Sequence, residues 1–514
     1  MFSLNNPSRR RTVKILTIGN YSVMILDIIQ GLLFVPLYLH FIGTKLYGLW
    51  LGTGGVISAL SFLDLGLATL IIQRISREYG KKDFNGVGKY FFSGIMINIF
   101  FLTILLILGF IASYKLDIIF HYISLRDNQI LTKAFQFALI ALVLLLLNNS
   151  VEGTLNALQT PLFGKITLFT GALIGLLVTF LLLHGRNPLM AIPIGLLIRA
   201  IIPLVANIAY LMLIFVHNNI RLFSIQRRII KDYLKLTPSL MLSKFGTSLI
   251  GNIEPTLINI FIAPQIAVYY SVTKKAGQLI VTVLNRIGGV LYPSFAHLHA
   301  ESNLDVFKKY FIKVLNIIFP IALTMFISYF ILNKFFVQVW VGIGNFLGNE
   351  MTFLIAIALL ISFFSNFLSY LLSTTGDIKY TNIAVFSESM SKMIFLFLLT
   401  KYVGVVGLPI AIILASTFFI IIYLKRWNKH LLLKRHELKR LKKKFGYNIL
   451  SLIVTGSIIY FLLVNLKIQN IYGFIELSLI VVFVLIFFLI VTDNELRIYF
   501  LNRFKLFIRI GNHE

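Results

Sequence analysis

The sequence contains no cysteine, which excludes disulfide bonds, thiolate metal sites and thiol nucleophiles. Charged residues are also scarce, at 13% of 514 residues, whereas a soluble protein of this size has about a quarter. Apolar residues take their place: 58% of the chain is hydrophobic and the mean hydropathy is +0.88. Apolar runs of about 20 residues, the length that crosses a hydrocarbon core, recur along the chain. The sequence therefore predicts an all-α polytopic membrane protein.

Recognisable catalytic and nucleotide-binding motifs are missing as well. The sequence has no GxxxxGK[ST] phosphate loop and no HExxH pair, and its nine histidines are scattered. No predicted loop is long enough to form a soluble domain. We therefore predict that the chain is not an enzyme and has no metal site or organic cofactor. ATP-driven transport by this chain alone is unsupported, which leaves coupling to H⁺ or Na⁺ as the energy source to consider.

The hydropathy pattern predicts about fourteen transmembrane helices. Their approximate bounds are 14–42, 47–73, 90–113, 132–156, 165–184, 189–216, 237–262, 266–296, 310–332, 351–374, 381–400, 404–424, 446–466 and 473–492.

Basic residues fix the expected orientation of these helices. With the N-terminus in the cytoplasm, 33 of the 47 Lys and Arg residues fall in cytoplasmic segments and 8 fall in outer loops. The positive-inside rule then predicts a multi-pass membrane protein with both termini cytoplasmic. The same distribution argues that the net charge of +28 reflects membrane topology, so we predict no nucleic-acid partner.

The first twelve helices suggest two halves. Phe41-Ile42 and Phe261-Ile262 precede similar aromatic turns, and Lys89-Tyr90-Phe91 resembles Lys309-Tyr310-Phe311; both offsets are 220 residues. Six helices per half preserve orientation, which is typical of a parallel repeat. The predicted organisation is a six-helix lobe at 1–220, a six-helix lobe at 221–424, a basic cytoplasmic linker at 425–445, and a final helix pair with a basic tail at 446–514. The linker is expected to contact anionic membrane lipids.

Six basic side chains fall inside predicted transmembrane helices. A cation at the centre of such a helix costs about 2.5–3.5 kcal/mol on insertion scales, so it normally faces a watery cavity or a partner. Several together indicate a protein that handles an anion within the bilayer, because Arg and Lys replace the hydration that an anionic group loses. The predicted cationic cavity consists of Arg286, Lys275, Arg199, Lys244, Lys392 and Lys274.

Lys275 and Arg286 are the best candidates for an anionic headgroup, since they share one helix face with Gln278 and Thr282. Lys274 has two interpretations, a cavity residue or a side chain that snorkels to the outer interface.

Lys392 also has two interpretations. It follows Glu388 by four residues, in the favourable order for an ion pair, so the two form either a structural pair or a charge pair that substrate or a proton breaks.

Acidic residues within the helices are candidates for ion coupling, because a carboxyl group in a medium of low dielectric constant has a raised pKa. Glu152, near a helix end, is better explained by hydrogen bonds between helices. Asp64 has a second interpretation, as a capping or pairing residue near the cytoplasmic end of its helix. The coupling candidates are Glu254, Glu388, Asp27 and Asp64.

Several short motifs together point to one family of transporters. They are Tyr47-Gly48-Leu49-Trp50, Leu60-Ser61-Phe62-Leu63-Asp64-Leu65-Gly66-Leu67, Tyr269, Lys275, Leu291-Tyr292-Pro293 and Trp340-Val341-Gly342. With these residues the sequence resembles, over essentially the whole chain, the polysaccharide (O-antigen type) flippases of the multidrug/oligosaccharidyl-lipid/polysaccharide exporter superfamily. It departs from them at Val268, where a glycine is expected before the tyrosine.

The resemblance implies two six-helix lobes around a central cavity, alternating access and an ion gradient as the energy source. It also implies that the protein lies in the bacterial inner membrane. The implied substrate is a lipid-linked oligosaccharide on undecaprenyl diphosphate, moved from the cytoplasmic to the periplasmic leaflet for lipopolysaccharide O-antigen or another surface polysaccharide. A polysaccharide polymerase and a chain-length regulator are implied as partners.

Two other hypotheses stay open. A multidrug or organic-cation exporter of the same superfamily predicts a mainly acidic cavity. A membrane glycan polymerase or ligase predicts a large outer loop with clustered Arg and His, which this chain lacks.

Overall fold

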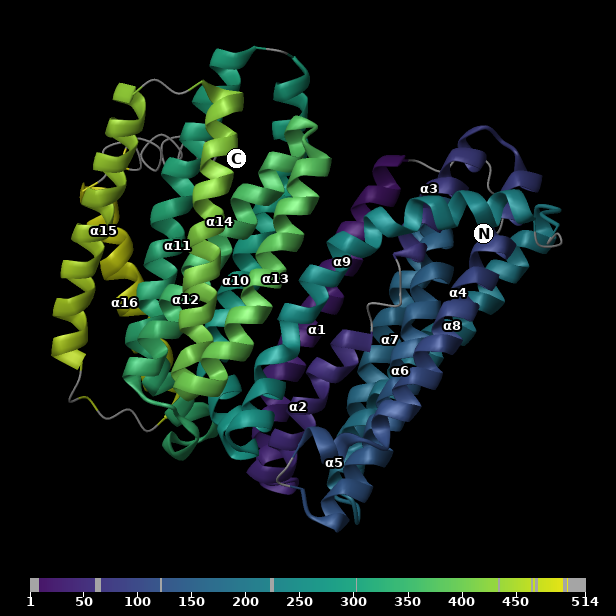
Figure 1. Cartoon of the computed structure of the whole chain (residues 1–514), viewed down its shortest axis with the longest axis horizontal. Helices are drawn as coiled ribbons and strands as arrows, with labels where there is room; N and C mark the ends of the chain where they lie inside the picture. The colour runs from purple at the N-terminus through teal and green to yellow at the C-terminus, as the bar shows by residue number, and fades with distance from the viewer. Residues whose placement is uncertain are drawn as a thin grey trace, which may run out of the picture. The chain divides into compact units, whose positions relative to one another are not determined.

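The computed structural model describes residues 9–60, 66–120, 123–221, 226–301, 303–432, 435–463, 466, 470–492 and 497. Within these residues the chain is all-α, and no β-strand occurs (Figure 1). The protein is a multi-pass membrane protein, because eleven described segments are long and apolar enough to cross a bilayer. One of them, Ile378–Leu431, contains two consecutive helices.

The chain forms two compact units, Met1–Val268 (unit 1) and Tyr269–Glu514 (unit 2). The helices of unit 1 are α1 (Arg9–Phe41), α2 (Thr44–Leu60), α3 (Leu67–Gly80), α4 (Phe84–Ser113), α5 (Leu116–Ile119), α6 (Leu125–Ala157), α7 (Pro161–Leu182), α8 (Ala191–His217) and α9 (Arg227–Phe261). The helices of unit 2 are α10 (Pro264–Ala300, whose first turn belongs to unit 1), α11 (Leu304–Val341), α12 (Asn349–Leu372), α13 (Ile378–Val403), α14 (Gly407–Leu431), α15 (Arg435–Leu463) and α16 (Ile471–Thr492).

Each of the fourteen predicted transmembrane segments coincides with at least one helix, so the predicted fold class is confirmed. The second predicted segment, 47–73, is wrong as one continuous helix. There α2 ends at Leu60 and α3 begins at Leu67, directly after Gly66, whose φ of 68° lies in the left-handed region. Hydropathy continues across this turn, because α3 buries an apolar face of its own that includes Leu70 and Ile71.

The predicted basic linker at 425–445 is mostly helical. α14 continues to Leu431 and α15 starts at Arg435, so the basic residues extend two apolar helices. Lys, Arg, Leu and Glu all have high helix propensity, which explains why the helices continue past the apolar residues. The high density of basic residues at 425–445 is therefore no sign that this segment is a loop.

Helix α9 belongs to unit 1, which ends at Val268, and it packs against α2; the division into six-helix lobes at residue 220 stays a prediction. α2 presents Gly48, Gly52 and Gly55 on one face, and the backbone of α9 approaches this face closely. Thr256 Oγ1 donates to the Gly52 carbonyl at 2.6 Å, and Asn259 Nδ2 donates to the Gly48 carbonyl at 2.9 Å. This glycine face attaches α9 to unit 1.

In unit 2, α15 and α16 pack along α11 and against each other (Figure 1). Leu323, Ile331 and Leu332 of α11 form a buried apolar cluster with Leu452 of α15 and Leu485 of α16. The final helix pair is therefore an integral part of unit 2.

Candidate substrate-binding and ion-coupling residues

Helix α10 carries Lys275, Gln278, Thr282 and Arg286 on one face, here called the α10 stripe. Thr273 fixes how this helix is rotated. The Thr273 carbonyl accepts hydrogen bonds from Tyr329 Oη at 2.8 Å and Asn333 Nδ2 at 2.9 Å. Its hydroxyl accepts from the Leu347 backbone N–H at 3.1 Å. Thr273 is fully buried, and each residue of a helix turns the direction by about 100°. Lys275, two residues later, therefore points to the opposite side of α10.

Lys275 is half-buried and has no hydrogen-bond or ion-pair partner among the side chains that the structure describes. Gln278, Thr282 and Arg286 follow it on the same face and are half-buried or exposed, whereas Leu284 on the other face is fully buried. The stripe therefore lies on the side of α10 that the core of unit 2 leaves open. An amine in this setting can bind an anion.

Lys274 lies inside unit 2. Its residue is 8% exposed, and its Nζ lies 5.6 Å from the centre of the Tyr270 ring, in cation–π range. The side chain does not extend outward, as snorkelling would require. Lys274 and Lys275 thus place two amines on adjacent positions, one buried and one accessible.

The predicted pair between Glu388 and Lys392 on α13 is confirmed. Lys392 Nζ lies 2.7 Å from Glu388 Oε1, and both side chains are less than a tenth exposed. Ser365 of α12 donates to Oε1 at 2.7 Å, and Tyr423 of α14 donates to Oε2 at 3.0 Å. Both carboxylate oxygens are therefore occupied, which favours the structural interpretation of this pair.

Arg199 of α8 pairs with helix α1 in unit 1. Its Nη2 lies 2.7 Å from Asp27 Oδ1, and its Nη1 donates to Gln30 Oε1 at 3.1 Å. The Arg199 stem packs on Gly175 of α7, where an added Cβ would lie 3.0 Å from the Arg199 Cβ. The Asp27 side chain is 48% exposed, so this ion pair is accessible, unlike that of Glu388.

A second ion pair in unit 1 joins α6 to α7. Lys165 Nζ lies 2.6 Å from Glu152 Oε1, and the Lys165 stem packs on Gly19 of α1. This contact agrees with the interpretation of Glu152 as a residue that bonds between helices.

The structure leaves three predicted residues without a described role. Glu254 of α9 is buried, at 4% exposure. Lys244 belongs to α9, but its side chain lies outside the described part of the chain, and Asp64 falls in 61–65, which is also outside it. The described residues contain no group of three or more His, Asp or Glu side chains that suits a metal ion.

An apolar cavity of about 500 Å³ adjoins the α10 stripe within unit 2. Ala276, Leu279 and Ile280 of α10 line it, facing α11 and the α16 residues Val482 and Ile486. Ala276 directly follows Lys275 in the chain. An anionic group at Lys275 and an apolar chain in this cavity would thus lie on neighbouring parts of α10.

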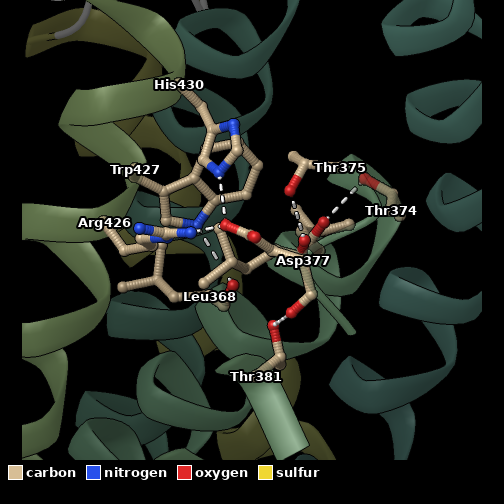
Figure 2. Close-up of polar contacts among 10 residues, drawn as sticks. Leu368, Thr374, Thr375, Asp377, Thr381, Arg426, Trp427 and His430 are labelled. Atoms are coloured by element: carbon tan, nitrogen blue, oxygen red, sulfur yellow. Dashed lines mark hydrogen bonds and ion pairs between the residues drawn. The ribbon is translucent and has the colours of Figure 1, made fainter. Parts of the chain in front are cut away.

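Figure 2 shows a polar cluster that joins the loop between α12 and α13 to the end of α14. Asp377 Oδ2 accepts from Arg426 Nε at 2.6 Å and lies 2.7 Å from His430 Nε2. The hydrogen bond from Arg426 lowers the pKa of Asp377 to about 2, and His430 adds to this effect. Beside them, Trp427 is buried and donates to the Leu368 carbonyl at 3.1 Å. The cluster fixes the α12–α13 turn on α14.

Sequence reasoning missed three features: the Asp27–Arg199 pair, the Asp377 cluster and the glycine face of α2. The two polar contacts join residues that are far apart in the sequence, so no local spacing indicates them. The glycine face had a visible signal, since Gly48, Gly52 and Gly55 recur at helical spacing.

A known protein family matches more than half of the chain. Residues 11–299, more than half of the chain, match the family described as Polysaccharide biosynthesis protein. No curated protein matches the sequence.

Solved structures with a similar fold are membrane transporters. The lipid II flippase MurJ in an inward closed conformation is 15% identical, with a TM-score of 0.67 over 92% of this chain and 97% of that chain. An inward-facing multidrug resistance MATE family transporter of the MOP superfamily is 15% identical, with a TM-score of 0.60 over 84% of this chain and 99% of that one. An outward-facing multidrug resistance MATE family transporter of the MOP superfamily is 16% identical, with a TM-score of 0.55 over 86% of this chain and 98% of that one. The TM-scores show a shared fold, and at such low sequence identity the similarity shows the fold alone.

Proposed function

This chain belongs to the polysaccharide biosynthesis protein family, and from that premise we propose that it is a flippase for lipid-linked oligosaccharides. Its fold is that of the transporters of the MOP superfamily, which are not enzymes. The proposed substrate is an oligosaccharide repeat unit on undecaprenyl diphosphate, and the proposed cycle is alternating access from the cytoplasmic to the periplasmic leaflet.

The observation that carries this proposal is Lys275, a half-buried amine that has no partner among the described side chains, within an apolar helix. Such a group is costly in a membrane protein unless an anion or water solvates it. Two of the other predicted cations, Arg199 and Lys392, are neutralised by carboxylates, so the α10 stripe from Lys275 to Arg286 is the better diphosphate site. Glycan hydroxyls then have Gln278 and Thr282 as hydrogen-bonding partners.

The apolar cavity between α10, α11 and α16 supports a lipid-linked substrate. Its lining begins at Ala276, next to Lys275, and continues to Leu489 of α16. We assign the start of the polyprenyl tail to this cavity, with the diphosphate at Lys275. The headgroup crosses while the tail stays in the apolar phase.

For ion coupling, we propose the Asp27–Arg199 pair over Glu388. The Asp27 carboxylate is accessible and has one described ion-pair partner, whereas both Glu388 oxygens are hydrogen-bonded in a buried site. Protonation of Asp27, or Na⁺ binding to it, would release Arg199 for an anionic substrate. Flipping in proteoliposomes that ignores both a proton and a sodium gradient would refute this coupling.

The proposed setting is the bacterial inner membrane with both termini cytoplasmic. The pathway would supply surface polysaccharide such as O-antigen of lipopolysaccharide, with a polymerase and a chain-length regulator acting on the exported units.

The test uses Lys275→Ala and Arg286→Ala, with Lys401→Ala at an exposed helix end as the matched control. Each variant is expressed in cells that lack their own flippase, and surface glycan and membrane protein levels are measured. We expect glycan display to fall at least tenfold in the two α10 variants and to stay normal in the control, at equal protein levels. Normal display in both α10 variants would refute the cationic site.

The multidrug-exporter alternative is favoured only by the shared fold of the MATE transporters. A site for organic cations needs accessible Asp or Glu side chains in excess of Lys and Arg, whereas the charged residues of the α10 stripe are Lys275 and Arg286. Energy-dependent ethidium efflux by the same cells, unchanged by Lys275→Ala, would support that alternative.

A further inference from the structure

A second apolar groove, of about 510 Å³, lies on the opposite face of α11 from the cavity assigned to the substrate tail. On α11 it is lined by Leu315, Phe319, Leu323 and Phe330, at helical spacing. Every residue that lines it, on α11, α12, α14 and α15, is Leu, Ile, Phe or Ala. The groove thus offers no hydrogen bond to a sugar or a peptide and suits only hydrocarbon.

One end of this groove is strongly basic. Phe445 of α15 lines the groove and directly follows Lys442, Lys443 and Lys444, while Leu424 of α14 directly precedes Lys425. Lys442 and Lys443 are exposed, and Lys442 lies one turn before Phe445 on the same helix face. The apolar groove therefore has amines at one end. A purely apolar ligand has no use for them, so they indicate a ligand with an anionic headgroup.

Two acids at this end are already paired. Glu437 of α15 forms an ion pair with Lys308 of α11, and Asp377 binds Arg426. Since the basic residues outnumber the acids here, the remaining charge is positive. The Lys308–Glu437 pair also ties α15 to α11 beyond the end of the groove.

Tyr447 marks this end as the depth of lipid headgroups. Its side chain is 61% exposed, and Lys443 Nζ lies 5.7 Å from the centre of its ring. Tyr residues are enriched at the membrane–water interface. From Leu315 to Phe330 the groove extends about 22 Å along α11, at 1.5 Å per residue. One leaflet of a hydrocarbon core about 30 Å thick measures about 15 Å, so the groove is long enough to hold an acyl chain over the full depth of a leaflet.

We propose that this groove is a binding site for an anionic phospholipid, with its acyl chains along Phe319 and Ile449 and its phosphate at Lys442 and Lys443. In the proposed orientation, the lipid belongs to the cytoplasmic leaflet. It would fasten α15 to α11, α12 and α14 and so hold the final helix pair on unit 2. The site is separate from the proposed substrate path, because α11 lies between them.

The experiment uses a fluorescent reporter in the groove, Phe445→Trp, with Trp50 and Trp340 replaced by Phe. Trp427 stays, and its own quenching is measured in the same protein without Phe445→Trp and subtracted. The protein is reconstituted in phosphatidylcholine vesicles in which a tenth of the lipid is phosphatidylglycerol. Two preparations differ only in which lipid carries bromine on its acyl chains, at equal mole fraction, since bromine quenches a nearby indole. We expect severalfold stronger quenching by brominated phosphatidylglycerol.

The matched variants reverse two charges each. Lys442→Glu/Lys443→Glu should abolish the preference for phosphatidylglycerol, and both positions are exposed, so folding is not at risk. Lys231→Glu/Lys235→Glu, at the exposed start of α9 in unit 1, changes the net charge equally and should retain the preference.

Three results would overturn the proposal: equal quenching by the two lipids, a preference that survives in Lys442→Glu/Lys443→Glu, or relief of quenching by polyprenyl phosphate that exceeds relief by unbrominated phosphatidylglycerol. The last would assign the groove to the substrate tail. The assay reads lipid binding alone, so its result does not depend on whether the chain transports a glycan.

Discussion

Glu388 and Lys392 show what local spacing reveals about a single residue. Their separation of four on one helix predicted the ion pair, because i and i+4 side chains are neighbours. Spacing did not reveal the hydroxyl groups of Ser365 and Tyr423, which come from two other helices and complete the site. Nor did it reveal Asp27 beside Arg199, since tertiary packing alone brings those helices together.

Removing one partner of the buried pair should be strongly destabilising. Glu388→Gln leaves the Lys392 ammonium buried without a counterion, which typically costs about 3–5 kcal/mol. We expect a large fall in the thermal unfolding temperature of the detergent-solubilised protein. Glu388→Gln/Lys392→Met removes both charges and should restore most of the loss. A single variant as stable as the wild type would show that the pair is solvated.

Asp377 gives a pH-dependent prediction. Its pKa is lowered to about 2 by Arg426 and His430, below the usual value near 3.9. A lowered native pKa stabilises the fold above the unfolded value, and that contribution is lost as the pH falls from about 4 toward about 2. Asp377→Asn should therefore unfold at a lower temperature than the wild type at pH 7, with the difference disappearing in acid (Figure 2).

The control for that measurement is Asp305→Asn, an exposed acid on the first turn of α11. It changes the net charge equally without touching the Asp377 cluster, so its difference from the wild type should be small throughout. A difference between Asp377→Asn and the wild type that persists unchanged at pH 2.5 would contradict the assigned cause.

At the scale of elements, hydropathy located the helices well, because crossing a bilayer requires a set length of apolar sequence. Hydropathy did not locate helix ends where a helix continues into polar sequence or is interrupted within apolar sequence. α15 extends into its basic stretch because helix-forming residues need no apolar partner there, and the left-handed Gly66 precedes α3 inside an apolar run. Unit 1 includes α9 because glycines permit a close contact between α2 and α9, which no hydropathy measure contains.

The close packing around α2 predicts a sharp difference between two of its glycines, because Gly48 faces Pro264 at the start of α10. A Cβ on Gly48 would lie 1.9 Å from the Pro264 carbonyl oxygen, which is backbone and cannot move aside easily. A Cβ on Gly54 of the same helix would lie 3.8 Å from the Asn252 Cβ, an ordinary contact. Gly48→Ala should cost about 1–3 kcal/mol through overpacking, whereas Gly54→Ala should be neutral or slightly stabilising through helix propensity.

Thermal unfolding of the two purified variants in detergent, together with membrane yield, checks this prediction. If Gly48→Ala and Gly54→Ala were equally stable, α2 would not be in close contact with Pro264 at the start of α10.

At the scale of the whole molecule, the contacts within each unit bear on orientation. In unit 2, His430 at the end of α14 lies beside His299 at the end of α10, and Lys308 at the start of α11 pairs with Glu437 at the start of α15. In unit 1, Arg74 of α3 pairs with Asp232 at the start of α9. These helix ends are the segments that the positive-inside rule assigns to the cytoplasm, so folding gathers the basic segments of each unit at one end.

A cysteine-free chain allows a direct test of that orientation, because one introduced cysteine gives one labelling site. Arg186→Cys and Lys401→Cys replace exposed residues in predicted outer loops, and Lys231→Cys and Lys429→Cys replace exposed residues on the predicted cytoplasmic side. In cells with a permeabilised outer membrane, a membrane-impermeant maleimide should label the first two before lysis and the second two only after it. The reverse pattern would invert the protein, and the phosphate site at Lys442 and Lys443 would then face the periplasmic leaflet. Labelling of one residue from each pair before lysis would mean that one predicted helix does not cross the membrane.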